Sequence, residues 1–154
     1  MTRAEAAALF GRLLYGSNPG PTASEEQGFA DLSLSGDFSW AAPWAAALKE
    51  NGYLSGCARE PILFCPAVPL SRVDSIILML RTIYGANFSP PPAVGKFSDV
   101  SIRWEETAWI EVAYQLELLE PCKTTERMRF CPYGAITRGE VAAMVVRALG
   151  LMKP

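Results

Sequence analysis

Four cysteines, at positions 57, 65, 122 and 131, are the residues whose type and spacing most directly indicate chemistry. Seven and eight residues separate the members of the two pairs, so disulfides Cys57–Cys65 and Cys122–Cys131 are the simplest interpretation. A zinc site of all four thiolates is a rival, although such sites usually contain close pairs such as Cys-x2-Cys. Free thiols are a third alternative. Disulfides predict an oxidising compartment outside the cytosol.

The remaining polar residues give little indication of catalysis. Histidine, the commonest general base and metal ligand, is absent from the chain. Glu105, Glu106 and Glu111 are predicted to form a solvated helix face, and Asp31 and Asp99 to be turn or cap residues. We therefore expect no catalytic residue, no bound metal and no cofactor, and we expect that the chain is not an enzyme.

An internal repeat of about 66 residues determines how the chain is organised. Four pairs of features recur at nearly the same offset: 64–66 with 130–132, 70–74 with 136–140, Trp44 with Trp109, and 29–32 with 97–100. The start of the chain, Thr2-Arg3-Ala4-Glu5, matches 71–74. A further arginine follows nine residues later in every copy, as Arg12, Arg81 and Arg147. Such periodicity is typical of repeat architectures.

The repeat predicts the domain organisation. The predicted segments are a closing helix of a first, incomplete repeat (1–17), a linker (18–28), a second repeat (29–88), a Pro-rich linker (89–96) and a third repeat (97–154).

Each full repeat is predicted to contain the same elements. A tryptophan-bearing helix comes first, at about 40–52 or 104–119, and then a cysteine-bounded loop, at 57–65 or 122–131. A closing helix follows at 71–85 or 137–150, and Ser or Thr before it with an acidic residue three positions on predicts a capping box. Closing helices that are apolar on most sides are expected to be buried. The sequence therefore predicts a mainly α fold around a central three-helix bundle.

The ordered pattern of Phe-x-Asp-Val, a tryptophan helix, Phe-x-Pro and Ile-Thr-Arg-Gly-Glu is similar to S-layer homology repeats, chiefly over 97–151 and more loosely over 29–84. The resemblance implies a three-helix bundle with helix-and-loop prongs. It also implies a cell-surface module that anchors a secreted protein to the bacterial envelope through a cell-wall polysaccharide, often a pyruvylated one. The motif arginines and nearby aromatic residues are then candidate ligand-binding residues: Arg3, Arg72, Arg138, Trp44 and Trp109.

Other interpretations of these residues stay open. Each motif arginine could instead form a structural ion pair, and Trp44 and Trp109 favour core packing because they lie on apolar helix faces. Trp40 and Trp104 are expected to be partly exposed. The incomplete first repeat favours an alternative function, a structural subunit of an extracellular lattice or filament, because an uncovered apolar face usually marks an interface.

Composition narrows the possible partners. The 154 residues are 50% apolar and 19% charged, with a net charge of −2 and no basic cluster, which argues against nucleic acid. The sequence has no stretch of 18 consecutive apolar residues, so it predicts no membrane span. The N-terminus lacks the layout of a signal peptide. The expected partners are cell-wall polysaccharide or neighbouring protein subunits, with a possible homo-oligomer or a larger parent chain. The expected location is extracellular, at the surface or envelope of a bacterium.

Overall fold

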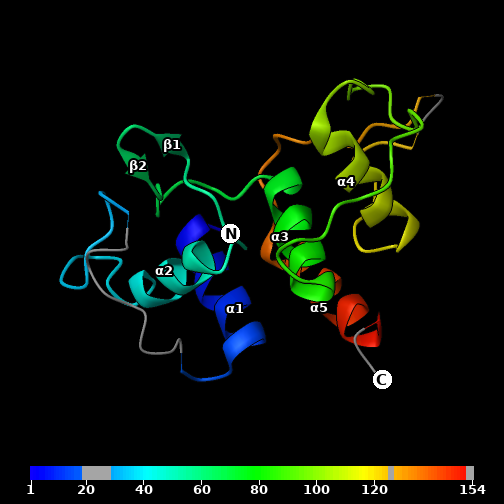
Figure 1. The fold of residues 1–154 in the computed structure, drawn as a ribbon. Coiled ribbons are helices and arrows are strands. Elements are labelled where there is room, and N and C mark those ends of the chain that lie inside the picture. Colours follow the sequence, from blue (N-terminus) through cyan, green and yellow to red (C-terminus); the bar gives the residue numbers. More distant parts are fainter. Residues whose placement is uncertain (19–28, 125–126, 152–154) are drawn as a thin grey trace. The chain divides into compact units, whose positions relative to one another are not determined.

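The structure is a computed structural model that describes residues 1–18, 29–124 and 127–151 (Figure 1). The described residues are mainly helical, as predicted. The helices are α1 (Arg3–Tyr15), α2 (Ala42–Glu50), α3 (Arg72–Tyr84), α4 (Glu105–Gln115) and α5 (Arg138–Leu151), and a short antiparallel hairpin joins β1 (Ala58–Arg59) to β2 (Ile62–Leu63). The predicted linker at 18–28 lies almost entirely outside the described residues.

The chain forms two compact units, which have different boundaries from the sequence repeats. Unit 1 is Met1–Leu70 and unit 2 is Ser71–Pro154. Each unit therefore joins a closing helix to the tryptophan helix and cysteine loop that follow it in the chain. We call residues 29–70 and 97–136 the front halves of their repeats.

Local capping signals explain where the closing helices begin. In α1 the Thr2 hydroxyl accepts the Glu5 N–H, and the Glu5 carboxylate accepts the Thr2 N–H at 2.8 Å. Thr137 and Glu140 form the same reciprocal pair before α5, at 2.9 and 3.1 Å. These bonds satisfy N–H groups that the first helical turn leaves without an intrahelical partner.

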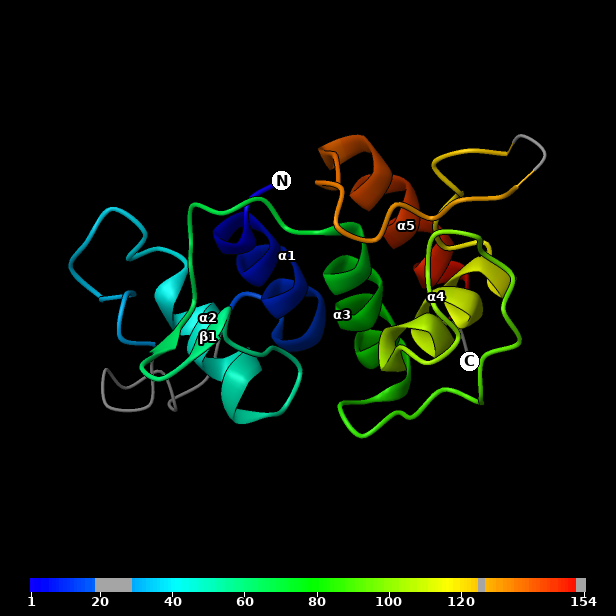
Figure 2. The same ribbon diagram turned by 90° about the horizontal axis from the view of Figure 1, so that it is seen from above.

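In unit 1, α1 packs against α2, as Figures 1 and 2 show. The approach is close because α1 carries small residues: a Cβ at Gly11 would lie only 2.6 Å from Cε3 of Trp44. The rings of Phe29 and Phe64, both buried, are tilted against each other with their centroids 5.0 Å apart. The core of the unit thus combines α1 with three segments of the front half, namely α2 and the segments that carry Phe29 and Phe64.

Unit 2 repeats this arrangement with α3 against α4, and it adds α5 against α3. Phe97 and Phe130 occupy the places of the unit 1 phenylalanines, with their ring centroids 5.6 Å apart. Helix α4 ends at Gln115 and not at 119 as predicted. The reason is local: Glu117 has a φ of +55°, in the left-handed region that cannot continue a right-handed helix.

Burial separates α5 from the other closing helices. It buries Val141, Met144 and Ala148 but exposes Val146, Leu149 and Leu151. The prediction that all three closing helices are buried on most sides is therefore wrong for α5. No helix in the described ranges has the length and apolar content needed to cross a membrane.

Candidate binding site

Both predicted disulfides are confirmed. Cys57 is bonded to Cys65 and Cys122 to Cys131, with Cα–Cα distances of 6.1 and 6.0 Å. Asp99 lies beside the second disulfide, and its carboxylate is within 4.8 Å of both sulfurs. These three residues do not suit a metal, because the thiols are consumed by the bond and the carboxylate accepts backbone hydrogen bonds.

Aspartates fix both cysteine loops over long sequence distances. The N–H groups of Phe64 and Cys65 donate to the two oxygens of Asp31, at 2.6 and 2.7 Å. Asp99 accepts the two equivalent N–H groups of unit 2 at 2.8 and 2.7 Å. Both aspartates lie in turns, as predicted, and each also holds a segment more than 30 residues away in the sequence.

The candidate arginines Arg3 and Arg72 lie inside their units, with exposed fractions of 7% and 5%. Arg3 donates from Nε to the carbonyl of Phe64 and from Nη2 to that of Ser55, both at 2.7 Å. Buried carbonyls need such donors, so the side chain ties the closing helix to the cysteine loop.

Arg72 connects the closing helix to the cysteine loop in the same way in unit 2. It donates to the carbonyls of Phe130 and Glu120, and it forms an ion pair with Glu140. Burial raises the pKa of Glu140, but the N–H and hydroxyl of Thr137 and the charge of Arg72 outweigh it and leave that pKa below its ordinary value. The third candidate, Arg138, is exposed on α5.

The candidate tryptophans Trp44 and Trp109 are buried in the two units. An arginine from the end of the closing helix covers each ring. Arg12 lies 5.2 Å from the centroid of Trp44, and Arg81 lies 5.4 Å from that of Trp109. Both distances fit cation–π contacts. The partial exposure predicted for Trp40 and Trp104 is confirmed, at 47% and 38%.

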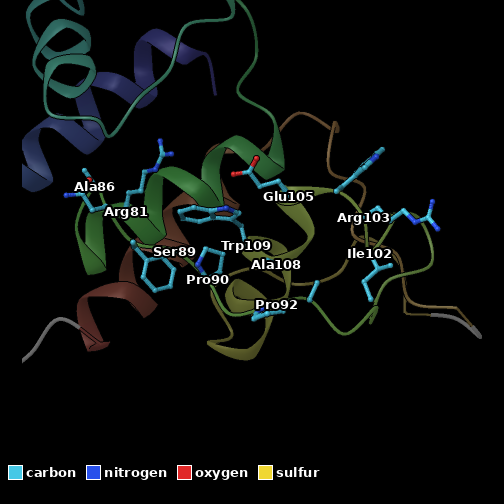
Figure 3. Close-up of a pocket in the computed structure, with 14 residues that line it drawn as sticks. Arg81, Ala86, Ser89, Pro90, Pro92, Ile102, Arg103, Glu105, Ala108 and Trp109 are labelled. Carbon is cyan, nitrogen blue, oxygen red and sulfur yellow. The ribbon is translucent and has the colours of Figure 1, made fainter.

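An open groove of about 570 Å³ lies in unit 2 between the end of α3, the Pro-rich segment 86–93 and the start of α4. Figure 3 shows Trp109 within its lining, with Arg81 and Arg103 on opposite sides of that ring. Burial lowers the pKa of Arg81, as expected for a guanidinium partly removed from water. Trp104 lines the same groove.

Trp104 also borders a second, smaller pocket of about 220 Å³. There its ring lies 5.7 Å, centroid to centroid, from that of the exposed Tyr133. The exposed aromatic surface of unit 2 thus runs from the groove toward the cysteine loop.

Glu111 holds the residues that directly follow the groove-lining segment 86–93. Its carboxylate accepts the N–H groups of Val94, Gly95 and Lys96 at 2.7, 2.7 and 2.8 Å. Glu111 is 3% exposed, so the predicted solvated position is wrong for this residue. Burial raises its pKa, but the three N–H donors and Lys96 outweigh this and lower it below the ordinary value.

Sequence reasoning did not single out Arg81 or Arg103 as site residues. A signal for Arg81 was present, because each closing helix carries an arginine nine residues after its motif arginine. Arg103 has no equivalent signal, since Ser39 precedes Trp40 where Arg103 precedes Trp104. No protein-family model matches this chain, and a search of curated proteins finds no match either.

Proposed function

We propose that this chain is a non-catalytic cell-surface module of the S-layer homology type, which binds an acidic cell-wall polysaccharide and so anchors a secreted protein to a bacterial envelope. The observation that carries the proposal is the groove of unit 2, with exposed Trp104 and Arg103 on its lining. An aromatic face offers a flat apolar surface to a sugar ring, and a guanidinium matches the two oxygens of a carboxylate.

Other features support the same function. Two disulfides fit a protein that works outside the cytosol. In this proposal α1, α3 and α5 are the helices of a three-helix bundle, and the front halves are its prongs. Arg3 and Arg72 bind carbonyls within their own units. We therefore place the proposed ligand contacts on the outer face of unit 2 and not on these motif arginines.

The test is a binding titration with a soluble, pyruvylated polysaccharide from bacterial cell walls. The same polymer after mild acid removal of its pyruvate ketals is the control ligand. Arg103→Ala is expected to weaken binding of the pyruvylated polymer about tenfold or more, the usual effect of losing a charge-assisted hydrogen bond. Binding of the stripped polymer is expected to be equally weak with or without the substitution.

Trp40→Ala is a matched control for Trp104→Ala, because each is a partly exposed tryptophan just before the tryptophan helix of its unit. Only Trp104→Ala is expected to reduce binding. Equal affinity for the native and stripped polymers, or equal losses in the two tryptophan variants, would contradict the proposal.

A further inference from the structure

The part of the chain that the structure describes contains three closing helices but two front halves. Helix α1 carries the front half 29–70, and α3 carries the front half 97–136. Helix α5 has the same sequence register as the other two, but the helix it packs against is α3, whereas α1 and α3 each pack against a tryptophan helix. The arrangement raises the question of which surface of α5 corresponds to the covered surfaces of α1 and α3.

Aligning the three helices on their motif arginines identifies that surface as a stripe of four register positions. In α1 and α3 the stripe is buried: Arg3, Ala4, Ala7 and Gly11, and Arg72, Val73, Ile76 and Leu80. In α5 all four positions are exposed: Arg138, Gly139, Ala142 and Val146. Val146 reaches 70% exposure, although the equivalent Leu80 is fully buried.

This difference does not arise from α5 being loosely packed. Three other register positions are buried in both α3 and α5: Ser75 with Val141, Leu78 with Met144, and Thr82 with Ala148. Helix α5 is therefore seated on one side, and the stripe lies on a side that stays in water. Exposed apolar helix surface of this kind usually marks an interaction site.

The two covered stripes show what chemistry fits the third. On α1, the tryptophan helix reaches the stripe at Gly11, which lies directly against Trp44. At the other end of the stripe, Arg3 and Arg72 donate to carbonyls that precede the second cysteine of each loop, at 2.7 and 3.0 Å. The stripe on α5 offers the same parts in the same order, with an arginine first and small or apolar residues after it.

We propose that the stripe of α5 (Arg138, Gly139, Ala142 and Val146) is a docking surface for a front half of this repeat type carried by another polypeptide. The tryptophan helix of that partner lies along Ala142 and Val146, and its cysteine loop lies at the Arg138 end of the stripe. A second copy of the same chain does not offer this partner, because its front halves already lie on its own α1 and α3. The interface is separate from the polysaccharide groove, so either proposal can fail without the other.

The test uses the full chain as receptor and amide hydrogen exchange of α5 as the readout. The probe is residues 17–154 with Val146→Asp, which presents the front half 29–70 without α1 and has its own stripe blocked. Mixing is expected to slow exchange at 142–147 of the full chain at least tenfold. Val146→Asp in the receptor is expected to abolish the effect, and Leu149→Asp, exposed but outside the stripe, is expected to preserve it.

A second variant decides the matter if the shortened probe does not fold. Residues 86–136 are repeated directly after Leu151, so that a front half follows α5 at the spacing seen after α3. Protection of 142–147 that disappears with Val146→Asp would support the proposal. Unchanged exchange in this variant would overturn it. So would self-association of the unmodified chain that Val146→Asp abolishes, since the occupant would then be a second copy.

Discussion

Units 1 and 2 share an internal frame of polar contacts that is reproduced almost bond for bond. In each unit a buried arginine donates to loop carbonyls, an aspartate accepts two successive loop N–H groups, a disulfide closes the loop, and a second arginine covers a tryptophan. The repeat therefore preserves the bonds that hold a loop on a helix.

The units differ on their outer faces. Unit 2 holds its Pro-rich segment on the carboxylate of Glu111, whereas the corresponding residue in unit 1 is Ala46, which has no polar side chain. Unit 2 also places Arg103 beside Trp104, whereas Ser39 precedes Trp40 in unit 1. The frame is thus common to both units, and the candidate binding surface arises where one unit departs from the other.

The largest expected effect comes from removing the buried arginines, which should damage both units if the frame is shared. Arg72→Met is expected to cost roughly 2–4 kcal/mol, because two carbonyls and Glu140 lose their donor in a buried place. Arg3→Met should cost about 1–3 kcal/mol, because the carbonyls of Phe64 and Ser55 lose a donor. Urea unfolding followed by tryptophan fluorescence measures both free energies.

Arg147→Met is the matched control, because this arginine forms an exposed ion pair with Glu120. Its loss should change the free energy of unfolding by less than about 1 kcal/mol. If Arg3→Met or Arg72→Met behaves like this control, the buried arginines do not hold the loops and the common frame is wrong.

The two disulfides provide the next comparison. Their sequence separations are 8 and 9 residues, so chain entropy predicts nearly equal stabilisation of about 2.5 kcal/mol for each. Replacing both cysteines of one pair by serine should lower the midpoint of thermal unfolding of that unit, and the size of the loss should match between units. A loss confined to one pair would show that the two loops depend on their disulfides to different degrees.

The sequence predicted the parts of this fold that depend on neighbouring residues. The starts of α1 and α5 follow from a hydroxyl and a carboxylate three residues apart, which interact within one turn. The cysteine pairing followed from a spacing that occurs twice. The end of α4 was missed because it depends on the left-handed backbone of Glu117, a residue type that gives no signal for that conformation.

The candidate site was less predictable because its contacts are remote in sequence. The carbonyl that Arg72 binds belongs to a residue 58 positions away, so a motif arginine that appeared available for a ligand is internal. The N–H groups that bury Glu111 come from a segment that the sequence indicated only as a linker. Periodicity identifies which residues are equivalent, but it does not show which of them face solvent.

Acid should destabilise unit 2 by protonating Glu111. Unit 1 has Ala46 at the corresponding position and should lack this effect. The folded pKa of Glu111 lies below its unfolded value of about 4.3, so the stabilisation is complete above that value and is lost as the pH falls through the folded pKa. Glu111→Gln should cost about 1–2 kcal/mol at pH 7, since an amide has one acceptor oxygen for three N–H donors. Unfolding at pH 7 and pH 3 measures the change.

The acid sensitivity of the Glu111→Gln variant should fall but not vanish, because the pKa of Glu140 is lowered in the same unit. Glu106→Gln, at an exposed position of the same helix, is the control and should change stability by less than about 1 kcal/mol. If Glu111→Gln leaves the free energy of unfolding unchanged at both pH values, the proposed difference in acid sensitivity between the two units is wrong.

A final pair of substitutions distinguishes a covered closing helix from an uncovered one, and the smallest effect is expected on the uncovered helix. Ala at Gly11 should gain about 1 kcal/mol of helix propensity, but its Cβ would meet buried Trp44 at 2.6 Å, so a net loss of about 1–3 kcal/mol is expected. Ala at Gly139 meets nothing within 4 Å and should stabilise the chain by about 0.5 kcal/mol. Thermal unfolding measures both signs. Because Gly139 belongs to the α5 stripe, a gain there would also show that the stripe is open to solvent in the isolated chain, whereas a loss would mean that it is already covered.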